Sequence, residues 1–276
     1  MAGDIHGSWL KEDHDLLMAL KPDAILFVGD LGDGHIGNVK AIRRLDIPKA
    51  LILGNHDRGK DLSGFHLKQQ LDLLGDIDCS WRHCNWHNLQ LSIVGGRPCS
   101  SGGGFYLSPQ IKSVFGPITL HDSVCRIVSA AKQVPLENPL IILAHSGPTG
   151  LGSQASSICG RDWKLPPIDW GDQDLAIAIN QIQKQRSLDL VVFGHMHHRL
   201  KRSKGFRETF FYDSIRDTCF LNAACVPRRG NDENGVALCH LSWVEFSNNK
   251  LIEASHRWFR SDASLAYKEE LFVRKI

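Results

Sequence analysis

Short apolar runs recur along the first two thirds of the chain, and most of them end in glycine followed by a polar residue. Five runs have the length and apolar character of buried strands: residues 24–28, 50–53, 89–94, 140–143 and 188–193. Amphipathic segments predict helices over residues 9–20, 36–45, 65–74, 123–133 and 172–185. Because strand and helix alternate, we expect βαβ units with right-handed crossovers and a parallel sheet.

The pattern changes near residue 206, where helical segments give way to strands. The predicted strands cover residues 209–212, 218–222, 236–246 and 251–259. We expect them to pair antiparallel and to form a second sheet that packs on the first. A chain of 276 residues suits a single domain, residues 1–276. In it, residues 1–200 carry the polar strand ends and residues 201–276 supply the mainly antiparallel second sheet.

Residues that bind hard divalent metals stand where several of the first strands end. Five segments carry them: Gly3-Asp4-Ile5-His6-Gly7, Gly29-Asp30-Leu31-Gly32-Asp33, Gly54-Asn55-His56-Asp57, Ala144-His145-Ser146 and Gly194-His195-Met196-His197. In an open α/β sheet, the carboxyl ends of the strands present their polar groups at one edge. Carboxylates, amide oxygens and imidazoles suit Mn, Fe or Zn better than thiolates would. These segments therefore predict a two-metal centre.

Taken in order, the segments read GDxH, GDxxD, GNHD, a lone His and GHxH, which resembles the signature of the calcineurin-like metallophosphoesterase superfamily. The resemblance extends over residues 3–197. It implies an α/β fold, a four-layer α-β-β-α sandwich of two mixed sheets flanked by helices. It also implies a phosphoric ester hydrolase that uses two divalent metal ions, with Mn favoured among Mn, Fe, Zn and Mg.

The resemblance further implies which side chains hold the metals. The first metal is held by Asp4, His6, Asp30 and His197, and the second by Asp30, Asn55, His145 and His195. Asp30 is the bridging residue, since the two oxygens of one carboxylate can bind cations ~3.5–4 Å apart. The implied nucleophile is a water between the metals, made hydroxide-like near neutral pH.

His56 is the motif histidine that this scheme leaves free of metal. From its place beside a ligand it can donate a proton to the leaving-group oxygen, a step typically worth ~10²–10⁴ in rate. Asp33 matches the family carboxylate that orients this imidazole and keeps it protonated, as a general acid requires. We therefore predict His56 and Asp33 as catalytic residues.

Two departures separate the chain from the Ser/Thr protein phosphatases, whose motifs read GDxVDRG and GNHE. Gly34 stands where those enzymes have a phosphate-binding arginine, and Asp57 stands where they have glutamate. The departures favour a phosphodiester, a nucleotide or a small phosphomonoester as substrate. A protein phosphatase and a non-catalytic scaffold are the alternatives, and the intact His56 argues against the scaffold.

Two loops bear on substrate contacts. Residues 95–104 (GGRPCSSGGG) form either a backbone cradle for phosphate, with Arg97 as its partner, or a mobile surface loop. Residues 146–171 directly follow His145 and include Arg161; they form a lid, a specificity wall or a linker. These loops resemble segments of poorly characterised family members from cyanobacteria and plants.

The composition is that of an ordinary globular protein, with 42% hydrophobic and 22% charged residues. A net charge of +2 does not indicate nucleic-acid binding. The eight cysteines form no C-x-x-C pair, which excludes a zinc ribbon and favours free thiols in a reducing compartment. No apolar run approaches ~18 residues and no signal peptide opens the chain, so we expect no membrane contact. The expected location is cytoplasmic, or the chloroplast stroma if a precursor carried a transit peptide.

The amino terminus is short for the predicted fold. A strand is expected before Gly3, yet only Met1 and Ala2 stand there. In the family that the chain resembles, this strand is central. We therefore expect either an incomplete start or a first strand reduced to a stub.

Overall fold

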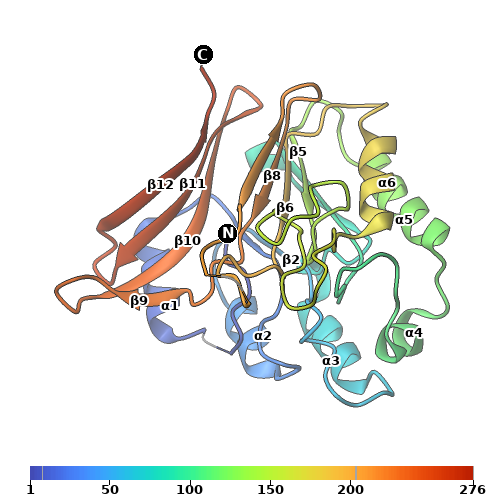
Figure 1. The fold of residues 1–276 in the computed structure, drawn as a ribbon, viewed down its shortest axis with the longest axis horizontal. Helices are drawn as coiled ribbons and strands as arrows, with labels where there is room; N and C mark the ends of the chain where they lie inside the picture. Colours follow the sequence, from blue (N-terminus) through green and yellow to red (C-terminus); the bar gives the residue numbers. More distant parts are fainter. Residues whose placement is uncertain (8, 203, 276) are drawn as a thin grey trace.

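Two β-sheets pack face to face, and helices cover their outer sides (Figure 1). The computed structural model describes residues 1–7, 9–202 and 204–275. The helices are α1 (Lys11–Leu20), α2 (Ile36–Arg43), α3 (Phe65–Leu74), α4 (Pro109–Phe115), α5 (Leu120–Lys132) and α6 (Gln173–Ile182). The predicted four-layer α-β-β-α sandwich of two mixed sheets is confirmed.

The larger sheet has six strands in the described part of the chain. In spatial order they are β3 (His83–Trp86), β4 (Leu91–Gly95), β5 (Leu140–Leu143), β6 (Leu190–Phe193), β8 (Thr218–Asn222) and β7 (Phe210–Asp213). The four inner strands run parallel, and β3 and β7 pair antiparallel at the two edges. Both β5 and β6 are buried along their whole length, because the sheet is covered on both faces.

The second sheet joins segments from both ends of the described chain. Its antiparallel part consists, in order, of β12 (Leu265–Val273), β11 (Lys250–Arg260), β10 (Ala237–Ser247) and β9 (Arg229–Asn231). Beside it lie the parallel strands β1 (Ile25–Phe27) and β2 (Lys49–Leu51). Ala2 pairs with Phe27 on β1, and Met1 exchanges two main-chain hydrogen bonds with Ser242 on β10. These first two residues therefore link the two parts of the sheet.

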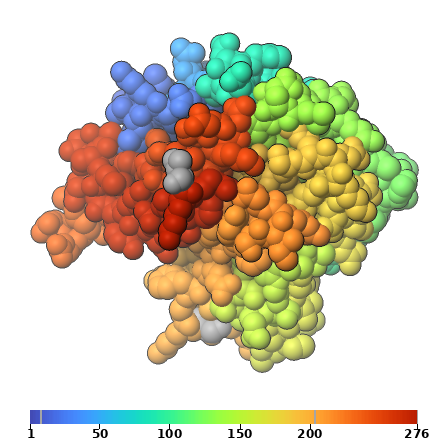
Figure 2. All heavy atoms as spheres, turned by 90° about the horizontal axis from the view of Figure 1, so that it is seen from above, coloured from blue at the N-terminus to red at the C-terminus, as the bar shows by residue number. Residues whose placement is uncertain are grey.

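Alternating side chains of β1 show how the layers pack. Leu26 lies in an apolar cluster with Ile141 of β5, between the two sheets. Its neighbours Ile25 and Phe27 belong to a second cluster that includes Leu17 of α1. On the other side of the molecule, α5 and α6 cover the larger sheet, as Figures 1 and 2 show in green and yellow. With both faces of β1 buried, the loop that follows it has a fixed position.

One part of the strand assignment made from the sequence is wrong. The sequence predicts residues 209–212 and 218–222 in the second sheet, but β7 and β8 belong to the larger sheet, where β8 lies parallel to β6. All five residues of β8 are buried, and a short buried strand carries no pattern that assigns it to one sheet. The strands β3, β9 and β12 and helix α4 have no counterpart among the predicted elements.

Candidate metal centre

The five motif segments meet at one edge of the sandwich, where β1, β2, β5 and β6 end. Several of their residues have left-handed backbone conformations, with φ of 49° at Asp4, 47° at His6, 53° at Asp30 and 66° at His195. This conformation costs free energy in a residue with a Cβ, and such strain collects at functional sites. Main-chain pairing holds the segments together: the His6 N–H donates to the Asp30 carbonyl at 2.7 Å.

A first group of metal-binding side chains consists of Asp4, His6 and His197, whose donor atoms lie within 4.8 Å of one another. The Nε2 atoms of His6 and His197 are 3.2 Å apart, and His197 Nε2 is 3.3 Å from Asp4 Oδ2. Asp4 Oδ2 is buried and has no hydrogen-bond partner among the described residues. A cation between these atoms would satisfy the buried oxygen.

A second group consists of Asp30, His145 and His195, again with donor atoms within 4.8 Å. The amide of Asn55 belongs beside it, because its Oδ1 lies 2.9 Å from His145 Nε2. The same nitrogen is 3.4 Å from Asp30 Oδ1. All seven predicted ligands therefore lie in two adjoining groups, with Asp30 in the second.

In the imidazole rings of His145 and His195, one nitrogen is hydrogen bonded to a main-chain carbonyl. His145 Nδ1 donates to the Val28 carbonyl at 2.6 Å, and His195 Nε2 donates to the Ser101 carbonyl at 3.0 Å. A carbonyl only accepts, so each neutral ring presents a lone pair on its other nitrogen. For His145 that lone pair faces the oxygens of Asp30 and Asn55. Asp30 Oδ1 also accepts from the His56 main-chain N–H at 2.9 Å. A carboxylate, an amide oxygen and an imidazole that converge in this way fit a divalent cation, and carbonyls behind metal-binding histidines commonly fix their orientation.

Two glycines allow these side chains to approach the main chain. A Cβ at Gly54 would lie 2.6 Å from a ring carbon of His145 and would overlap the Asp30 carboxylate. A Cβ at Gly194 would lie 2.6 Å from Asp4 Oδ1. The glycines before Asn55 and His195 are thus needed for space.

Buried charges dominate the electrostatics. Burial alone would raise the pKa of Asp4, but the His197 and His145 imidazoles outweigh it and lower the pKa to about 2. Burial, followed by the nearby His145, lowers the pKa of His195 to about 4. Burial would lower the pKa of His145 as well, yet the Asp30 and Asp4 carboxylates outweigh it and raise the pKa. The ionised Asp4 and neutral His195 are the forms that bind metals.

Asp57 is a site residue whose role the sequence did not reveal. Its wholly buried carboxylate accepts hydrogen bonds from the main-chain N–H groups of Leu31 at 2.7 Å, Gly32 at 3.2 Å and Gly54 at 2.8 Å. Burial, and after it the Asp30 charge, raises the pKa of Asp57 to about 7. Asp57 ties the second motif segment to the third.

His56 and Asp33 lie on the exposed side of the centre. His56 Nδ1 is 2.9 Å from Asp33 Oδ1, and the two side chains are 52% and 64% exposed. The His56 ring stands perpendicular to that of His6, with centroids 5.3 Å apart. Because the Nδ1 atom of His56 is paired with Asp33, its Nε2 atom can contact a substrate.

A cavity of about 710 Å³ opens beside this pair. Its lining includes Gly34, His35, Arg58 and Lys60. Arg58 is half-buried and Lys60 is exposed. The cavity therefore offers an anion two cationic side chains next to His56.

The glycine-rich loop 95–104 is neither a phosphate cradle nor a mobile surface loop, and both expectations for it are wrong. Its first six residues are buried. Arg97 is 3% exposed and pairs with Asp172 at 2.7 Å and with Asp174 at 3.0 Å, so its guanidinium is not available to a substrate. The loop instead supplies the Ser101 carbonyl that orients His195.

Two buried arginines, Arg161 and Arg207, hold the loop 146–171 in place. Arg161 is buried, donates to the Pro166 carbonyl at 2.8 Å and lies over the Trp170 ring. Arg207 donates to carbonyls of this loop and, at 3.1 Å, to the carbonyl of His197. Arg161 is consequently not a free phosphate ligand, and the loop is attached to the first metal-binding group.

A family model for calcineurin-like phosphoesterases matches residues 1–199. The chain belongs to this family and is a metal-dependent phosphoric ester hydrolase. No curated protein sequence matches the chain. None of the helices in the described residues is long and apolar enough to cross a membrane.

Two solved structures resemble the chain. A phosphopantetheinyl hydrolase from Mycobacterium tuberculosis is 13% identical over 80% of this chain and 86% of its own, with a TM-score of 0.49. A second structure aligns over 98% of this chain and 97% of its own at 9% identity and a TM-score of 0.52. The second likeness shows the fold alone.

Proposed function

We propose that the chain hydrolyses a phosphodiester, a nucleotide or another small phosphoester at a centre of two divalent metal ions. The observation that carries the proposal is the convergence of carboxylate and imidazole atoms in two adjoining groups, in a member of a phosphoesterase family. Such a pair of sites would leave a positive pocket that suits a phosphate group.

In this proposal each group of ligands holds one metal. Asp4, His6 and His197 hold the first; Asn55, His145 and His195 hold the second, and Asp30 serves both. One Asp30 oxygen lies with the second group, so its other oxygen is the one that we assign to the first metal. When bound, the metals polarise the phosphoryl oxygens and lower the pKa of a water molecule. Mixed oxygen and nitrogen donors suit Mn, which we favour over Fe, Zn and Mg.

We assign the general acid to His56. Its Nδ1 is held by Asp33, and its Nε2 would donate a proton to the oxygen of the departing group. The exposed position of both side chains allows the ring to be reprotonated from solvent after each turnover.

The cavity next to His56 would receive the leaving group. Arg58 and Lys60 line it, so a leaving group with its own negative charge, as in a nucleotide, would be favoured over a neutral one. The protein phosphatase alternative is less well supported, because Gly34 lines the same cavity without a side chain and both Arg97 and Arg161 are buried elsewhere.

The proposal is tested with a panel of esters under one metal condition. We expect Mn-dependent hydrolysis of an aryl phosphodiester or a nucleotide ester with a higher kcat/KM than of a phosphoserine peptide. A guanidinium clamp favours the dianionic monoester, and Gly34 cannot provide it. A clear preference for the phosphopeptide would contradict this function and favour a protein phosphatase.

A further inference from the structure

Two short hairpins lie side by side next to the metal centre, at the lower edge of Figure 2. The first runs from Gly160 to Asp169 and the second from Arg199 to Phe206, and in each an antiparallel bridge pairs the two end residues. We call them hairpin 160–169 and hairpin 199–206. Neither has a role in the proposed reaction.

Buried polar contacts hold the two hairpins against each other. The Asp162 carboxylate accepts hydrogen bonds from the main-chain N–H of Lys201 and, at 3.3 Å, from that of Arg202. Arg207, which directly follows the second hairpin, donates to the Gly160 carbonyl and lies 3.4 Å from Asp162 Oδ1. The two hairpins therefore present one common surface.

Large apolar side chains are exposed on both hairpins. Leu165 and Phe206 are each 65% exposed, and Trp163 and Ile168 are each 38% exposed. The Phe206 ring stacks on that of His198, with centroids 5.5 Å apart, so the surface adjoins the metal-binding histidines. A group of exposed apolar side chains marks a surface that a partner with apolar parts would cover.

The exposed charges of the two hairpins are all positive. The acidic residues in them are Asp162, which is buried and paired with Arg207, and Asp169, whose carboxylate accepts hydrogen bonds from Thr149 and Gly150. The chain as a whole has a net charge of only +2, so the positive charge is concentrated here. An anionic partner would complement it. The exposed cationic residues are Lys164, Arg199, Lys201, Arg202 and Lys204.

We propose that the two hairpins bind the surface of an anionic phospholipid bilayer. Trp163, Leu165 and Ile168 would enter the boundary between headgroups and acyl chains, a place that indole rings favour. The cations would contact the lipid headgroups, as clusters of lysine and arginine do. Single-stranded nucleic acid is bound by cations and stacked aromatic rings, and it would leave the two aliphatic side chains uncovered.

This contact does not require a membrane-spanning segment. The expectation of no membrane contact was based on the lack of a long apolar run, whereas a surface contact needs only a few apolar side chains and nearby cations. The proposal is also independent of the reaction at the metal centre, because binding is measured without a substrate.

The first test measures cosedimentation of the protein with two kinds of vesicle, one of phosphatidylcholine alone and one of phosphatidylcholine mixed with phosphatidylserine. We expect partition onto the mixed vesicles to be stronger by at least ~tenfold, because of the anionic headgroups. Added salt should weaken it, since salt screens exposed charges.

Paired variants test the apolar contribution. The double variant Leu165→Ser with Ile168→Ser should weaken partition onto the mixed vesicles at least ~tenfold, because less apolar surface enters the bilayer. The matched control is Leu136→Ser with Ile215→Ser, a leucine and an isoleucine that are exposed outside the hairpins. The control should change partition less than ~twofold.

A second pair of variants tests the cations. Lys201→Glu with Arg202→Glu should weaken partition onto the mixed vesicles at least ~tenfold and leave the phosphatidylcholine vesicles unaffected. Lys184→Glu with Arg44→Glu makes the same change of charge at exposed positions outside the hairpins. It should have a much smaller effect, because its charges lie away from the bilayer.

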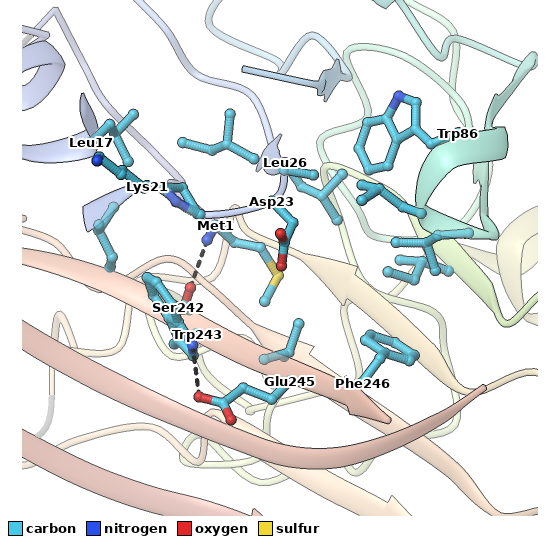
Figure 3. Close-up of a pocket in the computed structure, with 18 residues that line it drawn as sticks. Met1, Leu17, Lys21, Asp23, Leu26, Trp86, Ser242, Trp243, Glu245 and Phe246 are labelled. Atoms are coloured by element: carbon cyan, nitrogen blue, oxygen red, sulfur yellow. Dashed lines mark hydrogen bonds between the residues drawn. The ribbon is translucent and has the colours of Figure 1, made fainter. Parts of the chain in front are cut away.

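The second test locates the contact by quenching of tryptophan fluorescence with brominated phosphatidylcholine in the mixed vesicles. All seven tryptophans lie in the described residues, and Trp163 is the exposed one. The others are buried or half-buried, among them Trp86 and Trp243, which line a groove beside β10 (Figure 3). Most of the quenching should be lost in Trp163→Phe and retained in Trp86→Phe.

Several results would overturn the proposal: no binding to the mixed vesicles, equal partition onto both kinds, unchanged partition in either hairpin variant, or undiminished quenching in Trp163→Phe. Binding of a single-stranded oligothymidylate without binding of vesicles would assign the surface to nucleic acid instead. Far-UV circular dichroism checks that each variant is folded, and the wild-type comparison of the two vesicle types stands without any variant.

Discussion

At the residue scale, the candidate centre is built from side chains whose orientation is fixed on the side away from the metals. His145 and His195 each donate a hydrogen bond from one ring nitrogen to a main-chain carbonyl. The Asp57 carboxylate accepts hydrogen bonds from three main-chain N–H groups of two motif segments. Asp4 and Asp30 contribute a carboxylate to the first and the second of the two adjoining groups, respectively. Pre-oriented ligands bind a metal without a further loss of conformational freedom.

Asp30→Asn should damage both metal sites, because a neutral amide bridges two cations poorly. We expect the metal content of the purified protein, measured by plasma emission, to fall well below that of the wild type. Asp46→Asn at an exposed position serves as the control. Two equivalents of metal retained in Asp30→Asn would remove this residue from the bridging role.

His56→Ala should keep the metals and lower kcat by ~10²–10⁴, the usual contribution of a general acid. The loss should be smaller for a nitrophenyl ester, whose leaving group departs without a proton, than for an alkyl ester. The measurement is kcat for both esters in wild type and variant. Equal losses would indicate that His56 positions the substrate and does not donate a proton.

At the element scale, the unit that recurs after β1, β2 and β6 is a short buried strand, a glycine and a ligand. The strands β1 and β2 have three residues each, and the parallel pairing between them sets the spacing of the loops that follow. The glycine lets a neighbouring ligand pass close to the main chain, as at Gly54. The register between neighbouring strands therefore determines how the ligands lie relative to one another.

Gly54→Ala should reduce both metal content and stability, because the added Cβ would overlap the Asp30 carboxylate. We expect the free energy of unfolding to fall by ~1–3 kcal/mol, as overpacking of a tight site usually does. Gly37→Ala is the matched control: it is the second residue of α2 and has open space around it. We expect this change to leave the free energy of unfolding unchanged or to raise it by less than the ~0.5–1 kcal/mol found in a helix interior. The free energy of unfolding of both variants is measured by urea denaturation. A Gly54→Ala variant with the stability of the wild type would refute the steric argument.

At the scale of the whole molecule, the two sheets have different roles. The larger sheet and the β1–β2 pair end in the ligand loops, while β10, β11 and β12 form a broad antiparallel layer stabilised across strands. Glu253 on β11 pairs with Arg257 at 2.7 Å and with Lys268 of β12 at 2.9 Å. This layer can be perturbed without contact with the metal centre.

The Glu253 pairs predict a pH-dependent stability. Burial would raise the pKa of Glu253, but Lys268 and Arg257 outweigh it and lower the pKa from 4.5 to about 2. A carboxyl with a lowered pKa stabilises the folded state above its unfolded value, and this stabilisation is lost as the pH falls from 4.5 to about 2. Glu253→Gln should therefore lower the free energy of unfolding by ~0.5–1 kcal/mol at pH 7 and by nothing near pH 2. Glu233→Gln at an exposed turn is the control, and an equal effect at both pH values would contradict the account.

The sequence by itself determined the fold class, the order of the βαβ units and the residues of the candidate centre. Helix α3 and strands β5 and β8 have the predicted bounds, because periodicity and the residues at the ends of elements are local signals. The ligand side chains were predictable because each follows a buried strand at the edge where parallel strands end.

Only the tertiary structure decided which sheet takes β7 and β8, how Arg97 is used and what Asp57 does. A short buried strand fits either sheet equally well by its pattern, so its place depends on the partners available in space. Arg97 finds Asp172 and Asp174 some 75 residues away along the chain, and Asp57 finds main-chain groups 26 residues before it.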